Sequence, residues 1–103
     1  MIKYKIVKDN RNYKIEVKGH ANQNPYGSDI VCASVSTMLV MTINLLERLN
    51  LNCCNVSKPV FEEGYASIHI DCSNDTAVKI LDNLKDSLDM LTITYPKNIK
   101  SEK

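Results

Sequence analysis

The sequence has little surplus charge and few of the residues that build phosphate-binding loops. Its 103 residues include 13 basic and 12 acidic side chains, which gives a formal net charge of +1. Proteins that bind a phosphate backbone strongly usually carry a basic surplus, so direct nucleic-acid binding is not expected. The chain has only three glycines and no glycine-rich phosphate loop, so a nucleotide site is not expected either.

Long apolar runs and paired cysteines are also missing. The longest apolar run, 35–46, is interrupted by serine, threonine and asparagine, whereas a bilayer span needs about 20 predominantly apolar residues. The first seven residues alternate and do not resemble a secretory signal. The four cysteines include no C-x-x-C pair and are expected to be thiols. We therefore expect one cytoplasmic domain over residues 1–103, with no membrane contact and no cofactor.

Alternating apolar and polar residues predict a β-hairpin at the start of the chain. Segments 1–7 and 13–18 alternate on either side of the turn-forming residues 9–12. Lysines and Glu16 occupy the positions opposite the apolar residues. One face of the resulting sheet is therefore expected to be covered and the other to face water.

A second hairpin is predicted from segments 56–61 and 65–72. Pro59 within the earlier segment indicates an edge position or a bulge, because proline donates no backbone hydrogen bond. In the later segment, alternation places His69 and Asp71 on the face opposite the expected buried residues, which are Ala66, Ile68, Ile70 and Cys72.

Two helices complete the expected elements. The first should run from about Ile30 to Asn50, with Ser28 or Asp29 as its N-cap, and its first half is apolar on nearly every side. The second follows a cap at Ser73 or Asn74 and carries apolar residues at spacings of three and four. Segment 91–95 fits either this helix or a strand, and a short last strand is possible near 97–100. The order ββαββα predicts an α+β, two-layer fold in which an antiparallel or mixed sheet packs against both helices.

The residues with the most specific chemistry are His20 and Cys32. His20 follows a predicted strand, and Cys32 lies in the first turn of a predicted helix, with a polar loop between them. If Asp29 caps that helix, Cys32 is its third residue, where free N–H groups and the helix dipole favour a thiolate. Gly19 and Gly27 would let the loop fold back and bring the imidazole to the thiol. A cysteine nucleophile with a histidine base is the chemistry that this pattern indicates.

Supporting roles and simpler explanations stay open at this point. Asp29 either orients His20 or only caps the helix, and Ser36, one turn after Cys32, either supports the site or bonds back to a carbonyl. A buried, unreactive cysteine is also a common finding. A zinc site built from Cys53, Cys54, His69 and Cys72 is disfavoured, because His69 and Cys72 should lie on opposite faces of the sheet.

Taken together, these motifs resemble a known family. The segments Gly19-His20-Ala21 and Gly27-Ser28-Asp29-Ile30-Val31-Cys32-Ala33, with Ser36, are similar to the ribosomal-processing cysteine protease family Prp, and the likeness covers nearly the whole chain. The resemblance implies an α/β sandwich, a homodimer, and an endopeptidase. The implied substrate is the precursor of a large-subunit ribosomal protein of the L twenty-seven type, from which an N-terminal extension is removed.

The resemblance also assigns roles to individual residues. It implies Cys32 as the nucleophile and His20 as the base, and Gly19, Gly27, Asp29 and Ser36 match further positions of the family pattern near the site. A noncatalytic, ribosome-associated binding module with an incidental thiol is the alternative hypothesis. Cys53 and Cys54 are unusual, and their role is not assigned.

Overall fold

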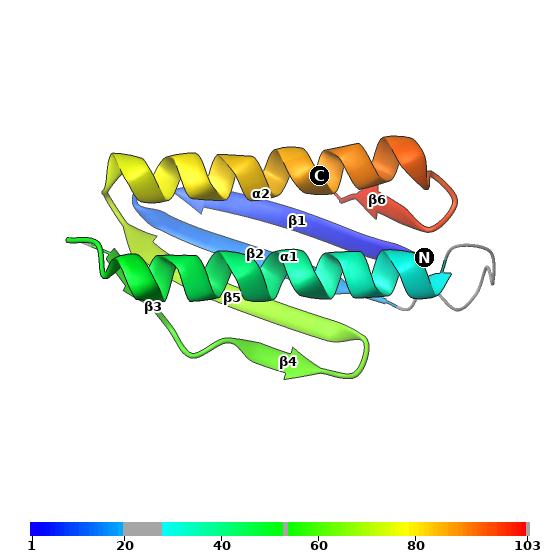
Figure 1. Ribbon diagram of the computed structural model, residues 1–103, viewed down its shortest axis with the longest axis horizontal. Coiled ribbons are helices and arrows are strands. Elements are labelled where there is room, and N and C mark those ends of the chain that lie inside the picture. Colours follow the sequence, from blue (N-terminus) through cyan, green and yellow to red (C-terminus); the bar gives the residue numbers. More distant parts are fainter. Residues whose placement is uncertain (20–27, 53, 103) are drawn as a thin grey trace.

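A mixed six-stranded sheet with both helices on one face forms the structure, a computed structural model that describes residues 1–19, 28–52 and 54–102 (Figure 1). The predicted α+β class is confirmed. The possible short last strand near 97–100 is present at 99–101, and one predicted strand is divided into two. In chain order the elements are β1 (Ile2–Asp9), β2 (Asn12–Lys18), α1 (Ser28–Leu49), β3 (Cys54–Val56), β4 (Val60–Glu62), β5 (Tyr65–Cys72), α2 (Asp75–Thr94) and β6 (Ile99–Ser101).

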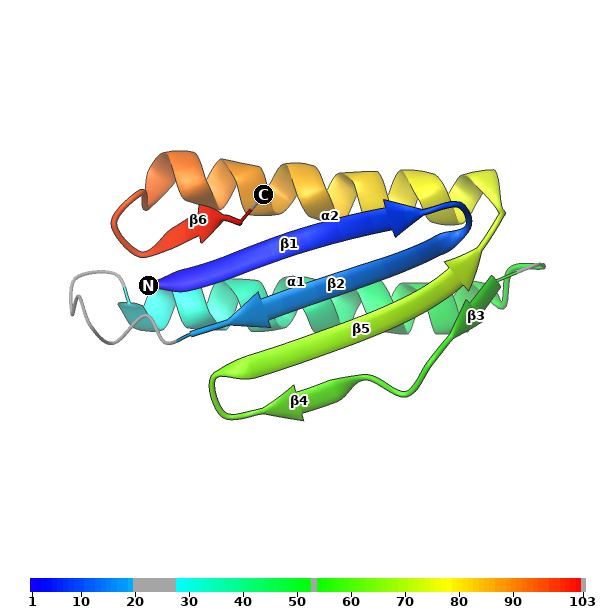
Figure 2. The ribbon, with the colours of Figure 1, turned by 180° about the vertical axis from the view of Figure 1, so that it is seen from behind.

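The sheet is built around the first hairpin. Its strands lie in the order β3-β5-β2-β1-β6, with β4 paired to β5. The pairs β1·β2 and β2·β5 are antiparallel, and β6 runs parallel to β1. Seen from behind, the sheet lies in front of both helices, and neither α1 nor α2 covers its near face (Figure 2). The prediction of one covered and one open face is therefore confirmed.

Alternating residues of the strands and one stripe of each helix form the core. Ile15, Ile68 and Ile70 lie at its centre and are almost completely buried. The Tyr4 hydroxyl, at the edge of this core, donates a hydrogen bond to Asp89 Oδ1 at 2.6 Å. On β5, Ile68, Ile70 and Cys72 are buried while His69 is exposed, as the alternation predicted.

The strand predicted over 56–61 is in fact two short strands. β3 pairs with the end of β5, and β4 pairs with its beginning. Pro59 lies in the break and has no N–H group with which to continue the ladder. The interruption sends the chain outward and lets β4 return beside Tyr65.

Helix α1 begins earlier than predicted. Ser28 and Asp29 both lie within its first turn, so the prediction that one of them precedes the helix as its N-cap is wrong. Cys32 is consequently the fifth helical residue, not the third. The helix ends at Leu49, and Asn50 follows with a φ of 45°, a left-handed conformation that asparagine tolerates and that often closes a helix.

Helix α1 is more apolar than the polar residues within segment 35–46 indicated. By length and composition, Ile30–Leu49 could cross a membrane, contrary to the sequence-based prediction. One stripe of this helix, however, is buried against the rest of the chain, as in the core helix of a globular domain: Val31, Val35, Leu39, Ile43 and Leu46.

Helix α2 follows its predicted pattern. Asn74 is the N-cap, and its side chain accepts a hydrogen bond from the Thr76 N–H at 2.9 Å. The ambiguous segment 91–95 is helical as far as Thr94. Pro96 lies beyond the helix, and the chain then returns as β6, which pairs with β1 at the edge of the sheet.

On the open face of the sheet, Glu16 is surrounded by cations. Its carboxylate lies within 4 Å of the ammonium groups of Lys5, Lys14 and Lys18, and it accepts a hydrogen bond from the Tyr65 hydroxyl at 3.2 Å. Burial raises the pKa of Glu16, but the Tyr65 hydrogen bond and the three lysines outweigh it, so this pKa lies below its ordinary value of 4.5. The ionised carboxylate therefore stabilises the folded state.

Replacing Glu16 with glutamine should remove a stabilisation that depends on pH. Because the pKa of Glu16 is lower in the folded state than in the unfolded state, its contribution is complete above the unfolded-state pKa and disappears as pH falls through the folded-state pKa. We expect E16Q to lose about 1 kcal/mol at neutral pH and to approach the wild type in acid. Urea unfolding at several pH values measures this difference. The exposed Glu63→Gln is the control, and an equal loss for both variants would contradict the assignment.

Candidate active site

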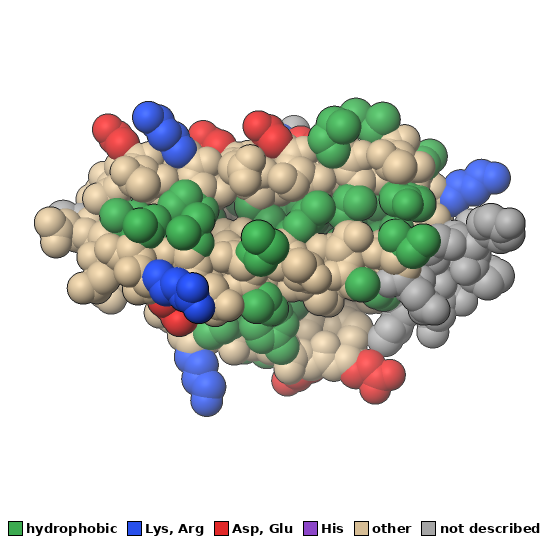
Figure 3. All heavy atoms as spheres, in the orientation of Figure 1, with side chains coloured by type: hydrophobic (Ala, Val, Ile, Leu, Met, Phe, Trp, Pro, Cys, Tyr) green, Lys and Arg blue, Asp and Glu red, His purple; other side chains and the backbone are tan. Residues whose placement is uncertain are grey.

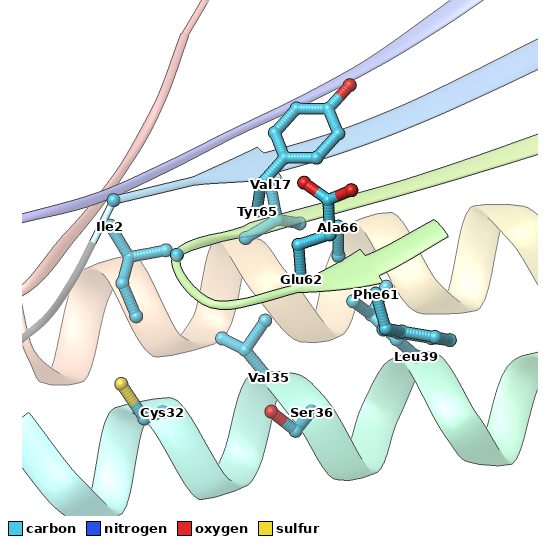
Figure 4. Close-up of a pocket in the computed structure, with 12 residues that line it drawn as sticks. Ile2, Val17, Cys32, Val35, Ser36, Leu39, Phe61, Glu62, Tyr65 and Ala66 are labelled. Carbon is cyan, nitrogen blue, oxygen red and sulfur yellow. The ribbon is translucent and has the colours of Figure 1, made fainter. Parts of the chain in front are cut away.

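Cys32 projects from α1 because its neighbours hold the helix against the sheet. Val31 and Val35 are four positions apart and bury 100% and 96% of their surfaces, so they fix the inner face of α1. Cys32 is displaced from that stripe by one residue and is exposed. Its thiol is directed from α1 toward the end of the sheet where Ile2 lies (Figure 4).

A mainly apolar pocket of about 150 Å³ opens beside the thiol. Helix α1 forms its floor, and the β4–β5 hairpin stands opposite (Figure 4). Phe61 is half exposed on this hairpin, an arrangement that leaves an aromatic surface available to a bound chain. The residues around the pocket are Ile2, Val17, Gly19, Cys32, Val35, Ser36, Leu39, Phe61, Glu62, Gly64, Tyr65 and Ala66.

Gly19 closes one end of this pocket and cannot be replaced by a larger residue without a shift of the backbone. Its φ is +98°, in a region that side chains with a Cβ rarely adopt. A Cβ at this position would overlap the carbonyl oxygen of Met1. The Gly19 N–H also donates a hydrogen bond to the Gly64 carbonyl at 2.9 Å. Gly19 therefore ties the end of β2, directly before His20, to the β4–β5 turn.

The structure brings together only part of the predicted site. Cys32, Ser36 and Gly19 border the same pocket. Asp29 lies in the first turn of α1, close to Cys32 along the chain. His20 and Gly27 lie outside the described residues, so the pairing of His20 with Cys32 stays a prediction.

The sequence analysis missed the contribution of β4. Phe61 and Glu62 form part of the pocket wall although they are about thirty residues from Cys32 along the chain. A local motif search does not detect such residues. The feature of the sequence that could have indicated this contribution is Phe61 itself, the only phenylalanine of the chain, two residues after Pro59.

The other described cysteines differ from Cys32 in their surroundings. Cys54 and Cys72 lie directly opposite each other on β3 and β5. Burial, together with the hydrogen bond to Cys72, raises the pKa of the Cys54 thiol to about 12. Cys72 is 2% exposed. Among the residues that the structure describes, Cys32 is therefore the cysteine suited to act as a nucleophile.

The geometry does not bring the residues of the disfavoured zinc site together on one face. Cys72 is buried beneath the helices, while His69 is exposed on the opposite face of the same strand. Cys53 lies outside the described residues. Within 1–19, 28–52 and 54–102, no three histidine, cysteine or carboxylate side chains are grouped closely enough to hold a metal ion.

An exposed thiol near the start of a core helix, beside an apolar pocket, defines a class of enzyme: a small α+β thiol hydrolase. Comparison with known families makes this more specific. The sequence model of the family described as cysteine protease Prp matches residues 1–100. The chain belongs to this family and is a cysteine protease.

Relatives of known name and structure agree with this membership. The ribosomal processing cysteine protease Prp of Staphylococcus aureus strain Mu50 is 32% identical over 85 residues, which cover 80% of this chain and 77% of the relative. A crystal structure of the S. aureus protease with a covalently linked product peptide has a TM-score of 0.78 and 30% identity, covering 99% of this chain and 98% of the other. Its complex with a substrate peptide has a TM-score of 0.76 and 29% identity, with the same coverage.

Proposed function

We propose that this cysteine protease is an endopeptidase that removes the N-terminal extension of a large-subunit ribosomal protein, of the L twenty-seven type, during ribosome assembly. Its S. aureus relatives carry the name of a ribosomal processing protease, and their structures hold substrate and product peptides. The observation in this chain that carries the proposal is the exposed Cys32 thiol at an apolar pocket large enough for one or two side chains of a peptide.

In the proposed reaction, Cys32 Sγ forms a bond to the carbonyl carbon of the scissile peptide. His20 takes the thiol proton and transfers it to the departing amine as the C–N bond breaks. Water then hydrolyses the thioester and restores the thiol. Backbone N–H groups in the first turn of an α-helix have no partner within the helix, and those of α1 would stabilise the negative oxygen of the intermediate. Asp29 would orient His20, and Ser36 would support the site from the next turn.

The β4–β5 hairpin should hold the substrate beside Cys32. Extended peptides often add to the edge of a sheet, and β4 forms such an edge next to the pocket. We expect Phe61→Ala to raise KM for an extended precursor peptide about tenfold, which is the effect of losing one apolar contact, with a smaller change in kcat.

A matched variant separates this effect from a general loss of stability. Val60 is adjacent, 43% exposed, and does not border the pocket, whereas Phe61 is 50% exposed and does. Steady-state kinetics should show an unchanged KM for Val60→Ala. Equal effects of the two substitutions would contradict the assignment of the pocket to substrate.

We also propose that two copies of the chain form a homodimer through the helical layer. Exposed apolar side chains lie along both helices and form green patches on this face (Figure 3). The patch includes Val40, Met41, Leu45 and Leu49 of α1 and Met90 and Ile93 of α2. A contiguous exposed apolar patch is typical of protein–protein interaction sites, and this supports the proposal. Sedimentation at micromolar concentration should show a dimer, and Met41→Asp should convert it to monomer.

We propose that the protease is located in the cytoplasm, because its proposed substrate is a component of the ribosome. The described cysteines Cys32, Cys54 and Cys72 are free thiols, which is typical of a reducing compartment. Fractionation of cells that express a tagged chain tests this, and recovery with the membranes or outside the cell would contradict it.

A further inference from the structure

The open face of the sheet has a feature that peptide cleavage does not explain. Strand registers place Lys100 of β6 opposite Lys3 of β1, and Lys3 opposite Lys18 of β2. Lys18 in turn lies opposite Tyr65 of β5. These four residues, here called the lysine row, cross four neighbouring strands on the face that neither α1 nor α2 covers (Figure 2).

The lysines of the lysine row do not stabilise the sheet. Like charges directly opposite each other on neighbouring strands destabilise a sheet. Lys18 is partly compensated by Glu16 at 3.5 Å and Glu102 at 3.6 Å. Lys3 and Lys100 are exposed and form no ion pair with a residue that the structure describes. These two lysines, which lie opposite each other on neighbouring strands, are therefore available to an anionic partner.

Further lysines extend the positive charge along the same face. Lys5 and Lys14 project from β1 and β2 around the carboxylate of Glu16. Other described carboxylates near this face include Glu102, which pairs with Lys18, and Asp71, which pairs with Arg11. The carboxylates of α2, such as Asp82 and Asp86, belong to the helical layer behind the sheet. The fold thus separates part of the charge that cancels in the sequence and leaves more lysines than carboxylates at this end of the open face. The net charge of +1, which predicted no nucleic-acid binding, does not describe this face.

We propose that this face binds single-stranded RNA, with Lys3, Lys18 and Lys100 contacting phosphates. Charge complementarity favours a polyanion, and the half-buried Tyr65 at the end of the row provides an aromatic ring next to the lysines. A positively charged track beside an aromatic surface is how sheets bind single strands without reading their sequence. The Tyr65 ring points away from α1, so it belongs to the open face (Figure 4).

The RNA site would lie at the same end of the sheet as Cys32. Lys18 directly precedes Gly19, and both Gly19 and Tyr65 border the pocket beside the thiol. Bound RNA would therefore keep the protease next to an RNA-containing particle, with the pocket reached from the other side of the same hairpin. This inference concerns a second binding site and does not depend on which peptide the enzyme cuts.

Fluorescence anisotropy with a labelled oligouridylate of about 12 nucleotides tests the proposal. Three phosphate contacts predict that log K falls with log salt concentration at a slope of about −2. The double variant Lys3→Gln/Lys100→Gln should reduce the slope to about −0.7 and weaken binding at low salt at least about tenfold. Absence of RNA binding by the wild type at low salt would overturn the proposal.

Matched variants and a second polyanion make the test specific. Lys58→Gln/Lys79→Gln removes the same charge from exposed positions outside the row, and it should retain more affinity than the row variant. E16Q removes a carboxylate from the face and should tighten binding. Equal losses in both double variants, unchanged binding in E16Q, or equal affinity for polyglutamate of the same length would each contradict an RNA site on this row.

Discussion

Replacing Cys32 with alanine is expected to lower kcat/KM for cleavage of an extended precursor peptide by at least about 10⁴-fold. The substitution removes the only described thiol that is exposed and next to the pocket. Because the side chain is not part of the core, the free energy of unfolding should change by no more than about 0.5 kcal/mol. This variant should therefore lose its activity while its stability stays close to that of the wild type.

Cys54→Ala provides the matched control for the loss of a thiol. Cys54 is half-buried at the other end of the sheet, opposite Cys72, so its removal should cost stability and leave cleavage intact. Initial rates of peptide cleavage and a thermal melt are measured on each variant. Cleavage by Cys32→Ala at the wild-type rate would rule out Cys32 as the nucleophile.

The second large effect is expected from His20→Ala, which should lower kcat/KM by about 10²- to 10⁴-fold, the usual contribution of a general acid–base group. A histidine base must be neutral to accept the thiol proton, so the wild-type rate should fall on the acid side of the pH profile. The variant should lose this dependence. Added imidazole should restore part of its activity, which a purely structural role of His20 would not allow.

His69 offers a control in the same chain. It is the only other histidine and is exposed on β5, on the face of the sheet away from the pocket. His69→Ala should cleave the precursor at the wild-type rate and retain the wild-type pH profile. If His20→Ala behaved in the same way as His69→Ala, the assignment of His20 as the base would be wrong.

Local patterns predicted most of the elements of this fold. The alternation of Tyr13, Ile15 and Val17 determines which face of β2 is buried, and Asn74 marks the start of α2. Register and element boundaries depend on other interactions. The break at Pro59 becomes two strands only because β5 is long enough to pair with both.

In the candidate site, too, residues close together in sequence could be predicted, whereas residues brought together by strand pairing could not. Cys32, Ser36 and Gly19 belong to one short stretch of sequence, and that stretch indicated their chemistry. Phe61 and Glu62 reach the pocket only through the pairing of β4 with β5, which no local motif encodes. The position of Cys32 within α1 was also misjudged, because two residues that can cap a helix lie inside its first turn.

Charge is the clearest case in which the composition of the chain does not describe one face of the molecule. Basic and acidic residues nearly cancel over the chain, yet alternation in β1 and β2 sends lysines to one face of the sheet. The parallel addition of β6 then brings Lys100 beside Lys3, across most of the length of the sequence. A cross-strand row of this kind depends on topology and cannot be read from net charge.

The central claim, that Cys32 is the nucleophile, is tested most directly by covalent trapping. The protein is incubated with a precursor-derived peptide that ends in a vinyl sulfone, and the adduct is located by peptide mapping and mass spectrometry. We predict one adduct per chain, on Cys32, with loss of cleavage activity in proportion to labelling. Cys54, with its pKa raised to about 12, and the buried Cys72 should stay unmodified. Full labelling of Cys32 with cleavage undiminished, or inactivation with the adduct on another residue, would contradict the account.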